Sequence, residues 1–367
     1  MPQELWGQWI GQIKGTNEAI VFLNIDFDKP NTGTISVFDF DTEHKASFNA
    51  DIIVQPDNKA ISATVANFRP FFFNNSDGEI NKPNCLIPKL TTLKGAIADN
   101  NNLEGEWSSD QNTKGTFKLR YQEADEEVHA DKVMTWEEFS KWSLDAKKEN
   151  RDLIFRGQKD STFRLTTNFH RQNRRELSRY VHEDVTTLQR HLTPLLNRKL
   201  NTLDAQEFGE LLFLAQHHGF PTPLLDWSES PFVASYFAFQ EVPKRPTIEG
   251  HVRVFILDWL KWKKIGPGTV DTLVDPRPTF TPLFLQSRDN QRAFPQQAMV
   301  TFSNVLRIEN FIRFHEKLKG EKVLTIIDIP YNDRDKAMHE LQIMGVTSAS
   351  LFPGIDGVCK ALKEQYF

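Results

Sequence analysis

The first third of the chain alternates apolar and polar residues in short runs. The segments AIVFLNIDF, TGTISVFDF, AISATVANF and KGTFKLRY have a period of two, and clusters of Asn, Asp, Gly and Pro separate them. Closely spaced strands of this kind predict a small antiparallel β-barrel or β-sandwich over residues 1–125. The similar segments LWGQWIG and LEGEWSS, which both pair Gly with Trp, predict two related strands in that sheet.

A second pattern, in which helices and strands alternate, occupies residues 132–367 after an acidic connector at 123–132. Thr135 with Glu138 three residues later is a capping box, and it predicts a helix that buries Trp136, Phe139 and Trp142. The apolar segments DLIFRGQ, HVRVFILDW and KVLTIIDIP predict strands. The expected fold class is therefore α+β, with a β domain at 1–125 and an α+β domain at 132–367.

Glycine, proline and serine mark the expected ends of several helices in the second domain. Gly219 follows the apolar helix pattern AQEFGELLFLAQHH and is expected at its C-terminal end, as is Gly345 after DRDKAMHELQIM. Ser230 and Pro231 are a typical cap and first residue for the next helix. That helix, PFVASYFAFQ, is apolar nearly all round, which predicts deep burial.

The composition, 39% hydrophobic and 25% charged residues, is that of an ordinary globular protein. The sequence contains no run of about 18 apolar residues, so it predicts no membrane-spanning helix. The N-terminal sequence MPQELWGQWIGQ lacks the pattern of a signal peptide. The two cysteines, Cys85 and Cys359, suggest neither a disulfide framework nor a zinc site. Taken together, these features favour a cytoplasmic protein that makes no membrane contact.

The net charge of −5 is unevenly distributed. Residues 1–125 contain 17 acidic and 11 basic residues, against 32 acidic and 33 basic in the remainder. Because acidic residues are in excess in the β domain, we do not expect it to bind nucleic acid. The segment Asn168–Tyr180 is locally basic. It fits either a solvated helix face or a contact with phosphate or nucleic acid.

Arg156 is the first candidate for chemistry, because it ends an apolar strand and precedes Gly157. A guanidinium at a strand end, with glycine allowing a close approach of the backbone, suits a phosphate or pyrophosphate ligand. The competing interpretation is an arginine that pairs with a core carboxylate.

The segment QHHGFPTPLLDWSESPF supplies the next candidates, each with a structural alternative. Asp226 can orient Arg156 or a histidine, or only cap a turn. Trp227 can stack on a flat ring or pack in the core. Ser228 can bind a ligand hydroxyl, whereas His217 lies where it can cap helix carbonyls. Asn290, Arg292 and Gln296 form a third polar group, suited to a polar ligand or to a structural amide network.

Together these motifs resemble the FRG domain, a bacterial and phage family named for Phe-Arg-Gly, here Phe155-Arg156-Gly157 followed by Gln158. The family motif Gln-His-x-Gly-x-Pro-Thr-Arg-Leu-Leu-Asp-Trp-Thr-x-Asn-Pro is matched at Gln216, His217, Gly219, Pro221, Thr222, Leu224, Leu225, Asp226, Trp227 and Pro231. The chain departs from it with Pro223 for arginine, Ser228 for threonine and Ser230 for asparagine. A later Asn-x-Arg, Gln-x-Gly, Phe motif is matched at Asn290, Arg292, Gln296 and Phe302, with Ala298 for glycine. The resemblance leaves residues 1–122 unaccounted for.

The FRG pattern in turn resembles the Arg-Ser-Glu arrangement of ADP-ribosyltransferases, which implies a split sheet and NAD as the substrate. Carried over, Arg156 anchors the NAD phosphates with Gly157, Gln158, Trp227 and Arg292 around the cofactor, and Ser228 supports the nicotinamide side. Gln296 stands in the place of the glutamate, and a neutral amide neither stabilises positive charge as a carboxylate does nor acts as a base. Asp226 or His217 must supply that function, or the domain binds without turnover.

The leading expectation is transfer of ADP-ribose from NAD to a protein or nucleic acid, or NAD cleavage, in a toxin or phage-defence effector. An alternative is a non-catalytic nucleotide-binding or nucleic-acid-binding module whose β domain recruits a protein partner. A hydrolase that uses His217 and Asp226 on a phosphoester or glycoside is a third possibility.

Overall fold

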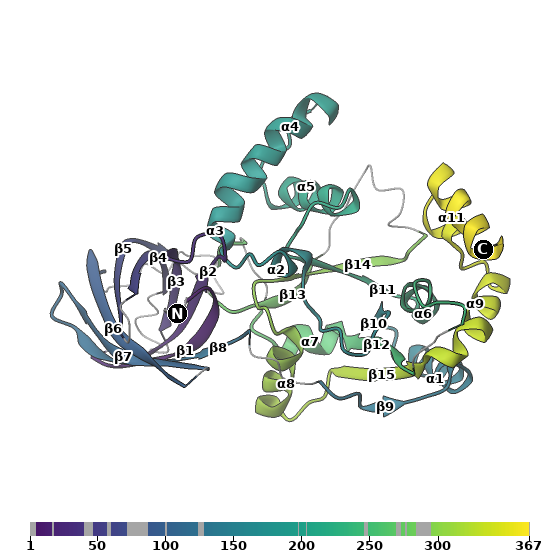
Figure 1. The fold of residues 1–367 in the computed structure, drawn as a ribbon, viewed down its shortest axis with the longest axis horizontal. Helices are drawn as coiled ribbons and strands as arrows, with labels where there is room; N and C mark the ends of the chain where they lie inside the picture. Colours follow the sequence, from purple (N-terminus) through teal and green to yellow (C-terminus); the bar gives the residue numbers. More distant parts are fainter. Residues whose placement is uncertain are drawn as a thin grey trace.

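An eight-stranded barrel and a seven-stranded sheet lie side by side in the computed structural model of the protein (Figure 1). The structure describes residues 5–16, 18–39, 47–56, 60–71, 87–99, 101–123, 128–196, 198–202, 204–245, 249–268, 273–275, 277–283 and 295–366.

The barrel resolves the choice between barrel and sandwich, because its first and last strands pair and close it. Every strand is antiparallel to its neighbours. The two Gly-Trp segments contribute to β1 and β7 of one sheet, as the sequence predicts, and the structure places these strands on either side of β8. The strands are β1 (Gly7–Gly15), β2 (Ala19–Ile25), β3 (Thr32–Asp39), β4 (Ser47–Pro56), β5 (Ile61–Phe71), β6 (Leu90–Asp99), β7 (Asn102–Ser109) and β8 (Lys114–Tyr121).

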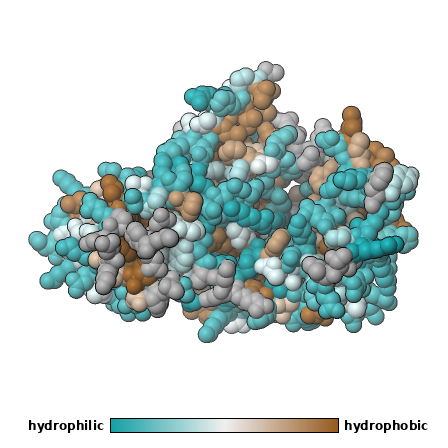
Figure 2. Space-filling view, viewed as in Figure 1, coloured by the Kyte–Doolittle hydropathy of each residue, from teal (hydrophilic) through white to brown (hydrophobic). Residues whose placement is uncertain are grey.

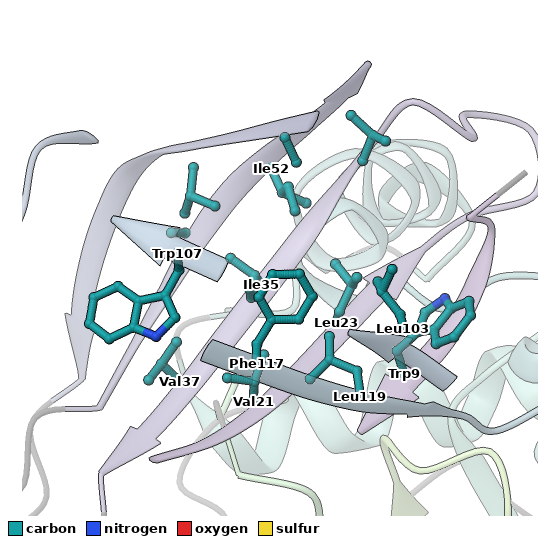
Figure 3. Packing of buried hydrophobic residues seen from close by; sticks show 14 of the residues in the cluster. Trp9, Val21, Leu23, Ile35, Val37, Ile52, Leu103, Trp107, Phe117 and Leu119 are labelled. Atoms are coloured by element: carbon teal, nitrogen blue, oxygen red, sulfur yellow. The ribbon is translucent and has the colours of Figure 1, made fainter. Parts of the chain in front are cut away.

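Side chains fill the interior of the barrel (Figure 3). Trp9, Leu23, Ile52, Leu103 and Phe117 are all buried there, as the period of two requires of inward-facing residues. The cavity that remains among them measures about 30 Å³. Since this is room for a water molecule or two, the interior does not hold a small-molecule ligand in this conformation.

The second sheet has the order β13-β14-β11-β10-β12-β15-β9 and is antiparallel apart from the parallel pair β15–β9. It is divided in the middle, because β10 and β11 share a single residue pair, Phe155 with Ser228. By contrast, β10 shares six pairs with β12, and β11 shares five with β14. The strands are β9 (Lys132–Val133), β10 (Leu153–Gln158), β11 (Leu224–Ser228), β12 (His251–Asp258), β13 (Phe280–Leu283), β14 (Ala298–Ser303) and β15 (Leu324–Pro330).

Helices cover both faces of this sheet. One face packs against α1 (Trp136–Glu149), α6 (Pro231–Phe239) and α9 (Arg334–Ile343), and the other against α7 (Trp259–Ile265) and α8 (Ile308–Lys319). A third apolar cluster lies among β11, β14 and the helical segments that precede β11. The remaining elements are α2 (Asn168–Arg171), α3 (Leu177–Arg179), a π-helix (Tyr180–Val185), α4 (Thr186–Leu196), α5 (Ala205–His217), a 3₁₀ turn (Tyr331–Asp333), α10 (Ser348–Leu351) and α11 (Ile355–Tyr366).

The predicted helix ends are confirmed. Thr135 and Glu138 form the capping box of α1, and Ser230 caps α6 with Pro231 as its first residue. Gly219 and Gly345 follow α5 and α9 with φ values of 82° and 79°, in the left-handed region that ends many helices.

A buried carboxylate joins the barrel to the second domain. Asp26, at the end of β2, is 0% exposed. It accepts hydrogen bonds from the guanidinium groups of Arg174 and Arg179, at 2.8 and 3.0 Å, and from the backbone N–H groups of Arg175 and Glu176, at 2.5 and 2.9 Å. Charge-assisted bonds to this many donors compensate for removing the carboxylate from water.

Further polar contacts extend this junction along neighbouring segments of the barrel. The amide of Gln8 donates to the carbonyl of Asn304 at 2.9 Å and accepts from the N–H of Leu306 at 2.8 Å. Arg307 donates to the carbonyls of Gln122 and Glu123, both at 2.8 Å. The barrel is therefore held by hydrogen bonds from two segments of the second domain, residues 174–179 between β10 and β11 and residues 304–307 after β14.

The basic segment Asn168–Tyr180 is largely taken up by this junction. Arg174 and Arg179 bind Asp26, Arg179 also binds Asp28, and Arg175 binds Glu123. Hydrogen bonds from Arg179 hold the pKa of the Asp28 carboxyl below its usual value, so this pair is complete at neutral pH and is lost as acid protonates Asp28. Neither interpretation of the segment from sequence anticipated an acidic partner within the same chain.

We expect Asp26→Ala to lower the free energy of unfolding by about 3 kcal/mol, because Arg174 and Arg179 each lose one carboxylate partner and two backbone N–H groups lose their acceptor. Asp51 is the matched control, since its pair with Arg69 is exposed. Asp51→Ala is expected to cost about 0.5 kcal/mol. Urea denaturation of both variants measures the difference, and equal losses would contradict the role assigned to Asp26.

Candidate functional site

A cleft of about 330 Å³ opens beside the single pair that joins β10 to β11. It receives side chains or backbone from both halves of the divided sheet and from α5 and α6. Its lining consists of Phe155, Arg156, Gly157, Gln216, His217, Asp226, Trp227, Ser228, Ala234, Phe237, Gln296 and Phe352. The structure thus brings together residues that lie up to 197 positions apart in the sequence, counting from Phe155 to Phe352.

Arg156 is the cation of the cleft. Its Nη1 donates to the backbone carbonyl of Asp226, and its Nε is buried with no hydrogen-bond partner among the described residues. Burial lowers the pKa of the guanidinium to about 10, against the opposing charge of Asp226, so the group remains cationic at neutral pH. A buried cation with an unsatisfied donor favours an anionic ligand.

Three motif residues form a chain of hydrogen bonds that ends at the carboxylate of the cleft. The hydroxyl of Thr222 donates to the side-chain oxygen of Gln216. The amide nitrogen of Gln216 then donates to Oδ1 of Asp226 at 2.6 Å. The spacing of Gln216, Thr222 and Asp226 in the sequence therefore corresponds to one continuous network that orients an exposed carboxylate next to Arg156.

Ser228 connects β11 to the residues that precede β14. Its hydroxyl donates to the carbonyl of Gln296 at 2.7 Å and accepts from the N–H of Ser230 at 3.0 Å. The side chain of Gln296 donates to the carbonyl of Leu351 at 3.0 Å. Both side chains line the cleft. Their hydrogen bonds also link β11 to the residues before β14, and those residues to the end of α10.

Gly157 serves a close approach within the protein. A Cβ at this position would lie 1.9 Å from the carbonyl oxygen of Ala234 in α6. The sequence suggested that the glycine admits a ligand, whereas the structure shows that it admits a helix. The glycine of the Phe-Arg-Gly motif lets α6 lie directly against β10.

Two predicted cofactor contacts have side chains that point elsewhere. Trp227 is 3% exposed, packs in the core beneath the sheet and donates from its indole to Thr301 at 2.9 Å. Neighbouring side chains along a strand face opposite sides of the sheet. Because Asp226 faces the cleft, Trp227 faces the core, and the indole of Trp227 does not stack in the cleft. Gln158 is also buried, donates to the carbonyl of Arg164 at 3.1 Å and does not line the cleft.

His217 is the last residue of α5 and lines the cleft. Its Nδ1 lies 3.1 Å from the carbonyl of Phe213, and its ring meets that of Phe213 edge to face. The capping role expected from its place at the helix end is therefore present. Asn290 and Arg292 lie outside the described residues.

Sequence reasoning missed the aromatic wall of the cleft, which Phe237 of α6 and Phe352 form with ring centroids 5.9 Å apart. Phe237 belongs to a helix that is apolar on every side, so periodicity could not single it out. Phe352 lies in the segment LFPGIDG, which also fits the closing part of the FRG pattern, and this fit is the signal by which the sequence could have pointed to it.

The described part of the chain holds no group of three or more His, Cys, Asp or Glu side chains that could bind a metal ion. Among the same residues, no helix combines the length and hydropathy of a membrane crossing.

Comparison with known proteins accounts for the motifs of this cleft. Residues 151–246 match the FRG domain. The chain carries an FRG domain. The matched region includes β10, α5, β11 and α6, and therefore Arg156, Gln216 and Asp226. The FRG match ends before β12, although β12, β14 and β15 continue the same sheet.

Other comparisons add little to the FRG domain. No curated protein matches the chain. Among solved structures, a de novo designed fluorescence-activating β-barrel is similar over 33% of this chain and 96% of its own, with 13% identity and a TM-score of 0.22. Similarity at that level supports no conclusion about this protein.

We expect Gly157→Ala to lower the free energy of unfolding by about 3 kcal/mol, because the added methyl group meets backbone that cannot move aside. Gly219→Ala is the control, since a Cβ there meets nothing within 4 Å and only its φ of +82° is unfavourable. Its cost is expected to be about 1 kcal/mol. Urea denaturation compares the two, and a smaller loss for Gly157→Ala would show that α6 can shift.

Proposed function

We propose that the cleft of the FRG domain binds NAD, breaks its N-glycosidic bond and transfers ADP-ribose to a macromolecule or to water. The observation that carries this proposal is the pairing of opposite charges at one place. Arg156 brings a buried cation, and Asp226 brings an oriented carboxylate, to the same cleft at the division of the sheet.

Each part of NAD has a matching group in the cleft. The pyrophosphate carries two negative charges, for which Arg156 supplies a guanidinium among the described residues that line the cleft. A flat ring suits the wall of Phe237 and Phe352, which offers aromatic faces and edges. The amides of Gln216 and Gln296 lie where they can bind ribose hydroxyls.

The carboxylate of Asp226 suits the charge that develops in this reaction. The bond between C1′ of the ribose and the nicotinamide nitrogen breaks, and its electron pair leaves with nicotinamide. Positive charge grows on C1′ and the ring oxygen, and a nearby carboxylate stabilises it. A nucleophilic oxygen or nitrogen of the acceptor then bonds to C1′ and loses its proton to solvent, which leaves nicotinamide and the ADP-ribosylated product.

A second candidate function is nucleotide binding without turnover, and Gln296 is the observation that favours it. The resemblance to ADP-ribosyltransferases places a glutamate where this chain has a neutral amide. Asp226 must replace that glutamate for catalysis. Nucleic-acid binding through Asn168–Tyr180 is disfavoured, because Arg174, Arg175 and Arg179 are already paired with the barrel.

A toxin or phage-defence effector in the cytoplasm, as the FRG resemblance implies, is the setting that we propose for this reaction. The target would be a protein or nucleic acid of the host or the phage. Because the barrel is fixed to the FRG domain by Asp26, a recruited target would be presented to the cleft at a constant distance.

Incubation with NAD labelled on the adenylate, in the presence of a cell lysate, tests the reaction. We expect label on macromolecules, or free ADP-ribose with nicotinamide, from the unaltered protein. Arg156→Ala should weaken NAD binding by about 10- to 100-fold, the effect of losing a charged hydrogen bond. Arg69→Ala, at an exposed ion pair on the barrel, is the control. Intact NAD in every reaction would reject catalysis. Absence of NAD binding would reject NAD as the ligand and leave the second candidate only with a different nucleotide.

Asp226→Asn separates catalysis from binding. Asparagine keeps an oxygen that accepts from Gln216 but removes the negative charge, so we expect kcat to fall by about 100-fold or more while KM changes little. Steady-state release of nicotinamide measures both constants. An unchanged kcat would exclude Asp226 as the group that stabilises the developing positive charge.

A further inference from the structure

The C-terminal helix α11 is amphipathic in the reverse of the usual sense. Its inward face carries Gly357, Ala361 and Glu364, which are buried or half-buried. Its large apolar side chains, Ile355, Val358, Leu362 and Tyr366, are 82%, 50%, 46% and 68% exposed. A helix at the surface of a globular protein normally buries such a stripe.

Specific contacts hold α11 in this orientation. A Cβ at Gly357 would lie 1.9 Å from the carbonyl oxygen of Phe352, so this side of the helix rests directly on backbone. Glu364 accepts hydrogen bonds from the hydroxyls of Tyr236 and Ser348, both at 2.9 Å. Lys360 donates to the side chain of Gln240 at 2.6 Å. These contacts prevent a rotation of α11 that would bury its apolar stripe.

The stripe forms a continuous outer surface. Its members recur at intervals of three, four and four residues, which places them along one side of a helix. Figure 2 shows hydrophobic side chains gathered over α11. This spacing is that of a helix that packs lengthwise against a second helix.

Charged residues beside the stripe are complementary to those of a second α11 helix. Asp356 and Lys363 are exposed and, at seven residues apart, lie on the same flank of the stripe. In an antiparallel pair related by a two-fold axis, the same flank of both helices faces the same side, with opposite ends adjacent. Asp356 of one copy then lies across from Lys363 of the other, twice per interface.

We infer that α11 pairs antiparallel with α11 of a second copy of this chain. The two-fold axis passes near Lys360, halfway between Val358 and Leu362, so that each stripe covers the other. This inference concerns the surface of α11 and holds whether or not the cleft acts on NAD.

Sedimentation velocity of the full chain at increasing concentration tests the pairing. We expect the sedimentation coefficient to rise toward that of a dimer. Leu362→Asp should raise the dissociation constant at least about tenfold, because it places a charge within the apolar contact. Leu318→Asp, at a 64% exposed position on α8, is the matched control and should leave association unchanged.

Charge reversal tests the antiparallel arrangement. Asp356→Lys and Lys363→Asp should each weaken association, because like charges then face one another, and the double variant should restore it. Cys359 is an exposed free cysteine one residue from the inferred axis, so the two copies of it lie about 3 Å apart along the helix direction. A short bis-maleimide should therefore cross-link a Cys85→Ser variant through Cys359.

A chain that remains monomeric at all concentrations would overturn the inference. So would failure of the double charge reversal to restore association, or equal dissociation by Leu362→Asp and Leu318→Asp. A monomer that sediments with lipid vesicles through Leu362 would assign the stripe to a membrane surface instead. Circular dichroism of each variant establishes that folding is retained, as expected for exposed positions.

Discussion

The contact between Gly157 and Ala234 is the constraint on which the second domain depends. With no side chain at Gly157, α6 lies directly on β10. This close approach brings the end of α6 next to the division of the sheet, where β10 and β11 meet at one residue pair. The cleft and its aromatic wall follow from a helix that is held against a divided sheet.

The motif residues of the FRG segment hold one another in place around the cleft. Thr222 and Gln216 orient Asp226, while Ser228 ties β11 to the residues that precede β14. These bonds hold a carboxylate and a guanidinium close together without a direct ion pair between them, since Arg156 donates to the carbonyl of Asp226. Groups that are oriented in advance in this way lose little free energy on binding a charged ligand.

The acidic barrel and the basic segment of the FRG side complement one another. Asp26, Asp28 and Glu123 neutralise Arg174, Arg175 and Arg179, so a segment that looks basic in sequence is not a free basic surface. Side chains fill the interior of the barrel and leave a cavity of about 30 Å³ in this conformation. The exposed apolar stripe of α11 lies at the opposite end of the molecule from the barrel (Figure 1).

The sequence alone determined the local features, because they depend on neighbours in the chain. Periodicity and turn residues placed the strands of the barrel, and Thr135, Gly219 and Ser230 placed helix ends through caps that involve only a few residues. The resemblance to the FRG domain also predicted that Arg156, Asp226 and Ser228 would be grouped. Only the tertiary structure decided that Gly157 faces a helix, that Trp227 turns into the core, that the basic segment binds Asp26, and that Phe352 closes the cleft. Each of these depends on a partner distant in the sequence, and hydrophobic patterns carry no information about which distant residue that is.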